Sequence, residues 1–391
     1  MEKTIVSAYY CDNYDRNKVF NVAEKILKSF GNISDIIKPN YKILLKLNLL
    51  SAYDPQQAIT THPEIVRAII RIVKQVGAIP VVGDSPGNLT NGIDTVWEKT
   101  GMFRLAKEEN IELVNFETIG CSTVSICHPT IKQVYVSKAI TDCDYIINIP
   151  KLKTHTFMGF TCGIKNFYGI IPGIKKVDYH KLAPTIDDFA CLLAQLYKIV
   201  KEKLLFTVVD GVCGLEGNGP SLRGIKRSYN IIAGSKDTVA LDTFLLNQFG
   251  VNTEKNKFLK PLKEQNLGNT DLQNIIYIGD AVSKFNIKKA KLPVTKILSM
   301  LPLWLARFVG KYGGKLFWIK PFVVKEKCIG CLQCMKSCPA QAIIKPNNSS
   351  KPFIQKNKCI GCFCCHELCL HKAVDIKKSL IASFFIKNEK E

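Results

Sequence analysis

Nine of the sixteen cysteines lie between residues 328 and 369, in two runs that share one spacing, Cys-x2-Cys-x2-Cys-x3-Cys. This spacing binds 4Fe-4S clusters, because a two-residue spacer wraps a tight loop around the cluster and points backbone amides at its sulfides. Gly330 and Gly361, two residues after the first cysteine of each run, supply backbone conformations that other residues resist. The sequence therefore predicts two 4Fe-4S clusters.

In a duplicated run of this kind, the fourth cysteine of each run binds the other cluster. The predicted ligands of the first cluster are Cys328, Cys331, Cys334 and Cys369. Those of the second are Cys359, Cys362, Cys365 and Cys338. Cys364 is then a spare thiol, because it follows Cys362 by one intervening residue rather than two. Zinc is the alternative metal, since four-cysteine zinc sites also use Cys-x2-Cys pairs. Three cysteines on one loop, however, suit a 4Fe-4S cubane.

These runs resemble the ferredoxin-type double 4Fe-4S domain over residues 321–378. The segments that follow the runs, "AQAI" and "HKAV", read as the helix and strand that pack against the clusters. The resemblance implies a small bacterial-ferredoxin-like α+β domain that transfers single electrons. Residues 379–391 are expected to be a tail.

Residues 1–280 alternate strand-length apolar runs with segments of helical period. Strands are expected at 3–10, 41–50, 79–84, 143–150, 203–211, 228–234 and 274–280. Between the second and third strands, residues 62–77 repeat apolar side chains at the spacing of one helical face, with Pro63 at the start and Gly77 at the end. The alternation predicts an α/β domain with a large, mostly parallel sheet.

Ligands of such sheets bind beyond the carboxyl ends of the strands. The residues at those ends are polar or glycine-rich in four segments, 46–51, 83–88, 148–155 and 210–224, which predicts one shared cleft.

The segment 148–180 carries the most chemistry and reads as a long polar loop. The candidate catalytic residues are His155, Lys153 and His180, because imidazole exchanges protons near neutral pH. The candidate substrate-binding residues are Lys151, Lys165, Asn166, Asp84, Asp210 and Glu216. Lysines and amides could hold a carboxylate or a phosphate. The alternative is a surface loop with solvated lysines, and turn or capping roles for the acidic residues.

The motifs "LLKLNLL", "THPEIVRAII", "GDSP", "NIPKLKTHTFMGFTCGIKNFYGIIPG", "VVDGVCGLEGNGP" and "KDTVALD" resemble the domain of unknown function 362 family. The resemblance covers residues 1–280 and implies that a ferredoxin-type domain is often appended. It implies no general activity and carries over no catalytic residue.

Residues 281–320 form a basic connector with an apolar helical stripe. The stripe either packs on a neighbouring domain or lies on a membrane through 294–314. The chain has 54 Lys and Arg against 33 Asp and Glu, a formal charge of +21. That balance favours an acidic redox partner protein or a small anionic substrate, and no nucleic-acid motif accompanies it. No signal peptide is recognised, so the expected compartment is the cytoplasm.

Three functions fit these observations. The first is an iron-sulfur oxidoreductase that relays single electrons to a substrate in the α/β cleft. The second is a non-catalytic electron-transfer or adaptor protein that serves a partner enzyme. In the third, the clusters are structural or sensory beside a non-redox enzyme.

Overall fold

The computed structural model describes residues 3–87, 92–173, 175–288, 290–293, 295 and 318–379. Most of the predicted connector, its 294–314 segment apart from residue 295, and nearly all of the tail lie outside these residues. Among the described residues, no helix is long and apolar enough to cross a membrane.

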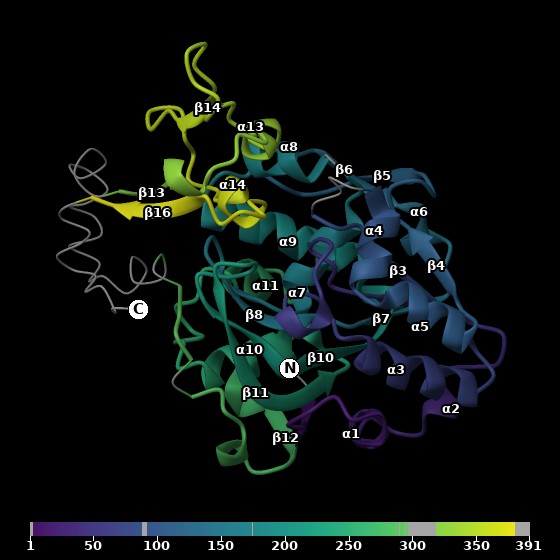
Figure 1. Ribbon diagram of the computed structural model, residues 1–391. Helices are drawn as coiled ribbons and strands as arrows, with labels where there is room; N and C mark the ends of the chain where they lie inside the picture. The colour runs from purple at the N-terminus through teal and green to yellow at the C-terminus, as the bar shows by residue number, and fades with distance from the viewer. Residues whose placement is uncertain are drawn as a thin grey trace.

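A ten-stranded sheet forms the centre of the large domain (Figure 1). Its order is β12 (Ile275–Gly279), β1 (Thr4–Tyr10), β11 (Gly224–Ser235), β10 (Leu204–Gly217), β7 (Tyr145–Asn148), β2 (Lys42–Lys46), β3 (Ile79–Asp84) and β4 (Glu112–Asn115). Strand β8 (Lys151–His155) also pairs with β10, and β9 (Gly159–Thr161) pairs with β8. The pairings of β11 with β1 and β10, and of β8 with β9, are antiparallel, and the others are parallel. The predicted α/β class with a mostly parallel sheet is confirmed.

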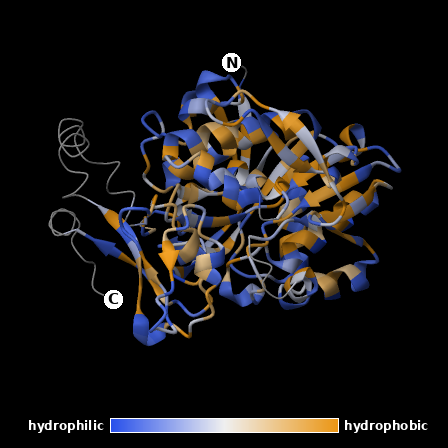
Figure 2. Ribbon diagram, turned by 90° about the horizontal axis from the view of Figure 1, so that it is seen from above, coloured by the Kyte–Doolittle hydropathy of each residue, from blue (hydrophilic) through white to orange (hydrophobic). Residues whose placement is uncertain are grey.

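Both faces of this sheet are covered, because alternate strand residues enter two different buried clusters. In β2, Ile43 and Leu45 face one cluster and Leu44 faces the other. The first face packs on α1 (Arg16–Lys28), α3 (Pro63–Gln75) and α5 (Met102–Glu109). The second packs on α7 (Gly163–Asn166), α9 (Ile186–Val200) and α10 (Thr238–Gln248). Apolar residues accordingly colour the centre of the domain in Figure 2.

The helix predicted over 62–77 is α3, and its ends follow from the sequence. The His62 side chain accepts a hydrogen bond from the Glu64 amide, and Pro63 takes the first helical position, where its missing N–H costs nothing. The helix ends at Gln75, and Gly77 follows with a φ of +75°. The apolar residues of the predicted face, Ile65, Ile69, Ile72 and Val73, are buried, and Val66, Arg67, Ala68 and Ile70 outside that stripe are buried as well.

The remaining elements of the large domain are short. The helices are α2 (Ile33–Ile36), α4 (Gly92–Lys99), α6 (Lys138–Thr141), α8 (Lys175–Leu182) and α11 (Lys260–Glu264). Strands β5 (Cys121–Ser125) and β6 (Gln133–Ser137) form a separate hairpin.

The cysteine-rich domain, residues 318–379, has two small sheets and two short helices. Strand β13 (Ile319–Val323) pairs with β16 (Val374–Lys378), and β14 (Ile343–Ile344) pairs with β15 (Phe353–Ile354). The helices α13 (Gln333–Lys336) and α14 (Cys364–Glu367) follow the second cysteine of each run. Figure 1 shows this domain, in yellow, against the side of the large domain that carries α8 and α9.

Candidate functional site

The two cysteine runs fold as matching halves. Gly330 and Gly361 have φ values of +76° and +72°, and each precedes a short helix. Leu332 and Phe363, at the helix starts, both take the left-handed conformation with a φ of 60°. The chain therefore makes the same tight turn after each pair of cysteines.

Backbone amides also point at sulfur in both halves. The Ala342 amide donates to Cys338 Sγ, and the Ala373 amide donates to Cys369 Sγ, each at 3.2 Å. Hydrogen bonds of this kind stabilise the thiolate form that binds iron.

The thiols gather in two groups, each with three members from one run and one from the other. Cys338 lines one pocket with Cys359, Cys362 and Cys365. The rest of that pocket is walled mainly by apolar residues, among them Pro321, Ala342, Ile343, Ile354 and Phe363. Cys369 lies beside Cys334, with Cys328 and Cys331 close by. In the described chain, no three His, Cys, Asp or Glu side chains converge as the ligands of a single metal ion would. Four thiols around an apolar pocket fit a 4Fe-4S cubane.

Helix α14 of the second run packs directly on strand β8 of the large domain. Glu367 Oε1, at the end of α14, lies 3.6 Å from His155 Nε2. The backbone carbonyl of Glu367 accepts a hydrogen bond from Ser221 Oγ at 2.7 Å. Arg223 also joins the domains, through an ion pair of 3.1 Å with Asp375. The candidate catalytic segment thus lies against the iron-binding domain.

The tautomer of His155 follows from its contacts. His155 Nδ1 accepts hydrogen bonds from the amides of Phe157 and Met158, at 3.1 and 3.3 Å. Burial and the nearby Lys165 charge lower the pKa of His155 well below its usual value. A neutral ring that accepts at Nδ1 carries its proton on Nε2, which faces the Glu367 carboxylate.

Two lysines lie in the same interface. Lys153 is 1% exposed and donates from Nζ to the carbonyl of Ile59 at 2.7 Å. Burial, together with the charges of Lys151 and Lys165, lowers the pKa of Lys153 to about 7. Lys165 lies over the rings of Tyr168 and Phe189, at 4.9 and 5.4 Å from their centroids. Burial lowers the pKa of Lys165 and raises that of Glu367, and the opposite charge of each partner resists both shifts.

His180 lies at the edge of this group, in an aromatic environment. Its ring stacks on Phe189, with 4.5 Å between centroids, and meets Tyr168 edge-on at 5.3 Å. Its Nδ1 atom is buried, and no described residue bonds to it. Burial lowers the pKa of His180 to about 3. The structure therefore brings all three catalytic candidates close to Lys165.

Lys151 and Asp210 are engaged with each other. They form an ion pair of 2.8 Å in which both side chains are fully buried. Asp210 also accepts from Tyr14 OH at 2.9 Å and from the His62 amide at 2.8 Å. Lys151 donates a second bond, of 2.8 Å, to Tyr14 OH. The contacts of these two substrate-binding candidates described above are thus all with other residues of the large domain.

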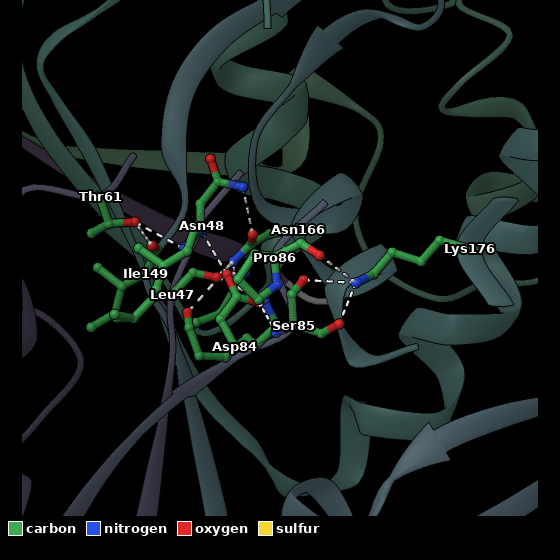
Figure 3. Close-up of polar contacts among 12 residues, drawn as sticks. Leu47, Asn48, Thr61, Asp84, Ser85, Pro86, Ile149, Asn166 and Lys176 are labelled. Carbon is green, nitrogen blue, oxygen red and sulfur yellow. Dashed lines mark hydrogen bonds and ion pairs between the residues drawn. The ribbon is translucent and has the colours of Figure 1, made fainter. Parts of the chain in front are cut away.

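Asp84 and Asn166 belong to a second internal network, shown in Figure 3. Asp84 pairs with Lys46 at 2.5 Å and accepts from the Leu49 amide. Asn166 donates to the Leu47 carbonyl at 2.9 Å and accepts from Asn48 Nδ2 at 3.1 Å. The ends of β2 and β3 and the segments after them therefore meet, joined by hydrogen bonds.

Glu216 is separate from these groups. It pairs with Arg227 at 2.9 Å and accepts from the Lys291 amide at 3.0 Å.

One expectation about local structure is wrong. Residues 148–180 are not a long polar loop, since they contain β8, β9, α7 and the start of α8, and Lys151, Lys153 and His155 are buried in β8. Strand β8 has no apolar run in its sequence. Its charged side chains can nevertheless be buried, because tertiary contacts that the sequence does not display provide their hydrogen-bond and ion-pair partners.

Sequence reasoning also missed Glu367. It occupies the position in the second run that Lys336 occupies in the first, one residue before the spacer ends. A position-by-position comparison of the two runs would have revealed this reversal of charge.

Comparison with known proteins agrees with this architecture. The family model for a domain of unknown function (DUF362) matches residues 43–247, and that for a 4Fe-4S dicluster domain matches residues 320–370. Thylakoid-associated protein sll1697 of Synechocystis sp. (strain ATCC 27184 / PCC 6803 / Kazusa) is 32% identical over 238 residues, 61% of this chain and 72% of that protein.

Among solved structures, the lactate racemase apoprotein from Thermoanaerobacterium thermosaccharolyticum aligns with a TM-score of 0.37 and 14% identity. The alignment covers 62% of this chain and 57% of that one. The two family matches show that the chain belongs to the DUF362 family and carries a C-terminal 4Fe-4S dicluster domain, with the electron-transfer capacity that such a domain implies.

Proposed function

We propose that this protein is an iron-sulfur oxidoreductase that delivers single electrons to a small anionic substrate where α14 meets β8. The observation that carries the proposal is the 3.6 Å contact between His155 Nε2 and Glu367 Oε1. Glu367 lies two residues from Cys365 and two from Cys369, predicted ligands of different clusters. The catalytic candidate His155 is therefore next to the helix that carries predicted cluster ligands.

The grouping of the thiols supports the crossed assignment of ligands. Cys338 lines a pocket with three cysteines of the second run, and Cys369 lies beside Cys334 of the first. When bound, two 4Fe-4S clusters would accept and donate electrons one at a time. Cys364 then remains the spare thiol.

The interface residues have the charges that such a substrate requires. Lys153 of β8 is buried and Lys165 of α7 is half-buried, and the two supply neighbouring amines. An anionic group would keep both in the charged form, because an opposite charge offsets the cost of burial. The substrate anion would displace the Glu367 side chain and make the same contact with His155.

The same residues can orient the substrate and supply a proton. The Nε2 proton of His155 points into the interface, since Nδ1 is held by two backbone amides. Lys153, with a pKa of about 7, exchanges a proton readily near neutral pH. Lys153 is the proposed proton donor, the neutral His155 ring orients the substrate by donating a hydrogen bond from Nε2, and His180 keeps Phe189 and Tyr168 in place around Lys165.

The cytoplasm is the proposed compartment. All sixteen cysteines are free thiols in the structure, as iron binding requires and as a reducing environment maintains. The redox partner or small anionic substrate expected from the net charge of +21 is part of the same proposal.

The test is anaerobic turnover with a panel of small carboxylates and phosphate esters as electron acceptors. Three variants should lose turnover and keep the cluster absorption of the wild type: His155→Ala, Lys153→Ala and Lys153→Met. Methionine fills the buried space of the lysine side chain better than alanine does. Lys176→Met is the matched control, because Lys176 is also a buried lysine but donates to the Ser85 carbonyl, outside this interface. Unchanged turnover in the His155 and Lys153 variants would exclude the site.

The adaptor function is the competing interpretation, and one observation favours it. The Lys153 amine already has a backbone acceptor, and Glu367 already faces His155. An adaptor would pass electrons to a partner enzyme and reduce none of the small molecules, with or without the substitutions.

A further inference from the structure

The two halves of the cysteine-rich domain differ in what covers them. At equivalent positions of the runs, Cys331 is exposed and Cys362 is buried. Ile329 is 66% exposed, whereas its equivalent Ile360 is half-buried. The large domain covers α14 of the second half, which leaves the first half facing outward.

The outward side is apolar around the first group of thiols. We call the surface made by Ile329, Cys331 and Leu370 the outer face. Ile329 follows Cys328, and Leu370, 40% exposed, follows Cys369. Two exposed aliphatic side chains thus directly follow Cys328 and Cys369, two thiols of the first group, and offer apolar contacts to a partner beside those thiols.

Exposed lysines flank the residues of this face in the sequence. Lys325 and Lys327, both exposed, precede Cys328, and Lys372, also exposed, follows Leu370. Residues 318–363 contain eight lysines and one acidic residue, Glu326. Within the described chain, none of those eight lysines forms an ion pair with a carboxylate. Their charge is therefore available to a partner.

We propose that the outer face docks an acidic one-electron carrier protein, which would supply electrons to the 4Fe-4S cluster that the first group of thiols would hold. The occupant follows from charge complementarity: an apolar patch with a basic rim fits an acidic rim around an exposed redox centre. In each encounter the reduced carrier loses one electron and this protein gains one, and no covalent bond is made or broken. This inference rests on the proposed redox function and gives the relay a direction, inward from the outer face to the α14 and β8 interface.

The repeat provides a matched experiment. Lys325 and Lys327 have equivalents in Lys356 and Lys358, which precede Cys359 by the same spacing and are also exposed. The double variants Lys325→Glu/Lys327→Glu and Lys356→Glu/Lys358→Glu therefore change the charge equally on the two halves. Ile329→Gln tests the apolar contact alone. All are made in the full-length, iron-loaded protein.

The first measurement is the rate at which a reduced acidic ferredoxin bleaches the protein's visible absorption in a stopped-flow instrument. The second is the Kd for the same ferredoxin substituted with gallium, which binds without electron transfer. At low salt, Lys325→Glu/Lys327→Glu should slow bleaching and weaken binding by about tenfold, and Lys356→Glu/Lys358→Glu by much less, with both differences shrinking as salt screens the charges. Ile329→Gln should weaken binding at every salt concentration.

Dithionite, a small reductant that needs no docking, should bleach all variants at the wild-type rate. Equal effects of the two double variants, a larger effect of the second, or no binding of the gallium protein to the wild type would each overturn the docking face. Binding of the wild type to anionic phosphatidylglycerol vesicles in place of the carrier, lost in Lys325→Glu/Lys327→Glu, would do so too. None of these results depends on turnover at Lys153 and His155, so failure of the docking proposal can be distinguished from failure of the proposed function.

Discussion

His155 Nε2 lies 3.6 Å from Glu367 Oε1, although the two residues are 212 positions apart and belong to different domains. The contact joins a buried strand of the DUF362 domain to the helix that carries Cys364 and Cys365. It places the polar chemistry of the large domain beside the cysteine runs.

The spare thiol can be separated from the ligands by substitution. Cys364→Ser should keep two clusters, because the spacing and the pocket assign Cys362 and Cys365, but not Cys364, as ligands. Cys362→Ser should lose one cluster, and with it about half of the iron. Iron and sulfide analysis of the anaerobically purified proteins measures both. Loss of iron in Cys364→Ser, with full iron in Cys362→Ser, would exchange the roles of the two residues.

Arg223 should hold the domains together. It pairs with Asp375 and donates to the Lys372 carbonyl, both in the cysteine-rich domain. Arg223→Ala should therefore speed hydrogen exchange at 151–161 and 364–368, where α14 covers β8. The substitution should weaken the docking of the two domains by about 1 kcal/mol, because the ion pair is partly exposed.

Arg227→Ala is the control for that change. Arg227 lies on the same hairpin but pairs with Glu216 inside the large domain. Equal exchange in the two variants would mean that Arg223 has no special part in docking.

The Lys151 and Asp210 pair should be indispensable for folding. Lys151→Met leaves a carboxylate buried without its cation, which typically costs about 3–5 kcal/mol in the free energy of unfolding. Adding Asp210→Asn should recover part of the loss, because the uncompensated charge is removed. Urea unfolding followed by circular dichroism measures both.

Lys18→Met is the comparison variant, since Lys18 pairs with Asp12 at a similar 2.7 Å on the surface. It should have no resolved effect. A Lys151→Met protein as stable as the wild type would show that the buried pair is not required.

Stability should fall as the pH falls below about 6.5. Burial lowers the pKa of His180 to about 3 and that of His62 to about 4. Below the unfolded value of about 6.5 the unfolded chain binds protons that the folded chain does not, so each histidine costs about 1 kcal/mol at pH 5.5. The loss continues down to the folded pKa.

His180→Phe should remove its share of this pH dependence and keep the stacking on Phe189. Urea midpoints at pH 7.5 and 5.5 show the difference, with His371→Gln, at an exposed histidine, as control. An identical slope in wild type and His180→Phe would contradict the neutral buried form.

The sheet could be predicted from the sequence because its strands are apolar runs. Those expected at 41–50, 79–84 and 203–211 contain β2, β3 and most of β10. Helix α3 was predictable from its periodicity and its Pro63 start. These elements are determined by local side-chain pattern and burial alone.

The site was only partly predictable, for a physical reason. Lys151, Lys153 and His155 looked like a polar loop, because a buried charged strand depends on distant partners such as Asp210 and Glu367. The side of the cysteine-rich domain that faces β8 is likewise a tertiary property. Sequence spacing identified the thiols but contained no information on which half is covered.

The central claim is that electrons reach an acceptor beside Lys153 and His155. It is tested most directly by single-turnover reoxidation of the dithionite-reduced protein, mixed in a stopped-flow instrument with a small anionic acceptor that the wild type reduces. We predict that Lys153→Met/His155→Ala recovers its visible absorption at least about a hundredfold more slowly than wild type with that acceptor, in the range of a lost acid-base group. Ferricyanide, which needs no site, should reoxidise both at equal rates. Reoxidation of the double variant by the anionic acceptor at the wild-type rate would contradict the account.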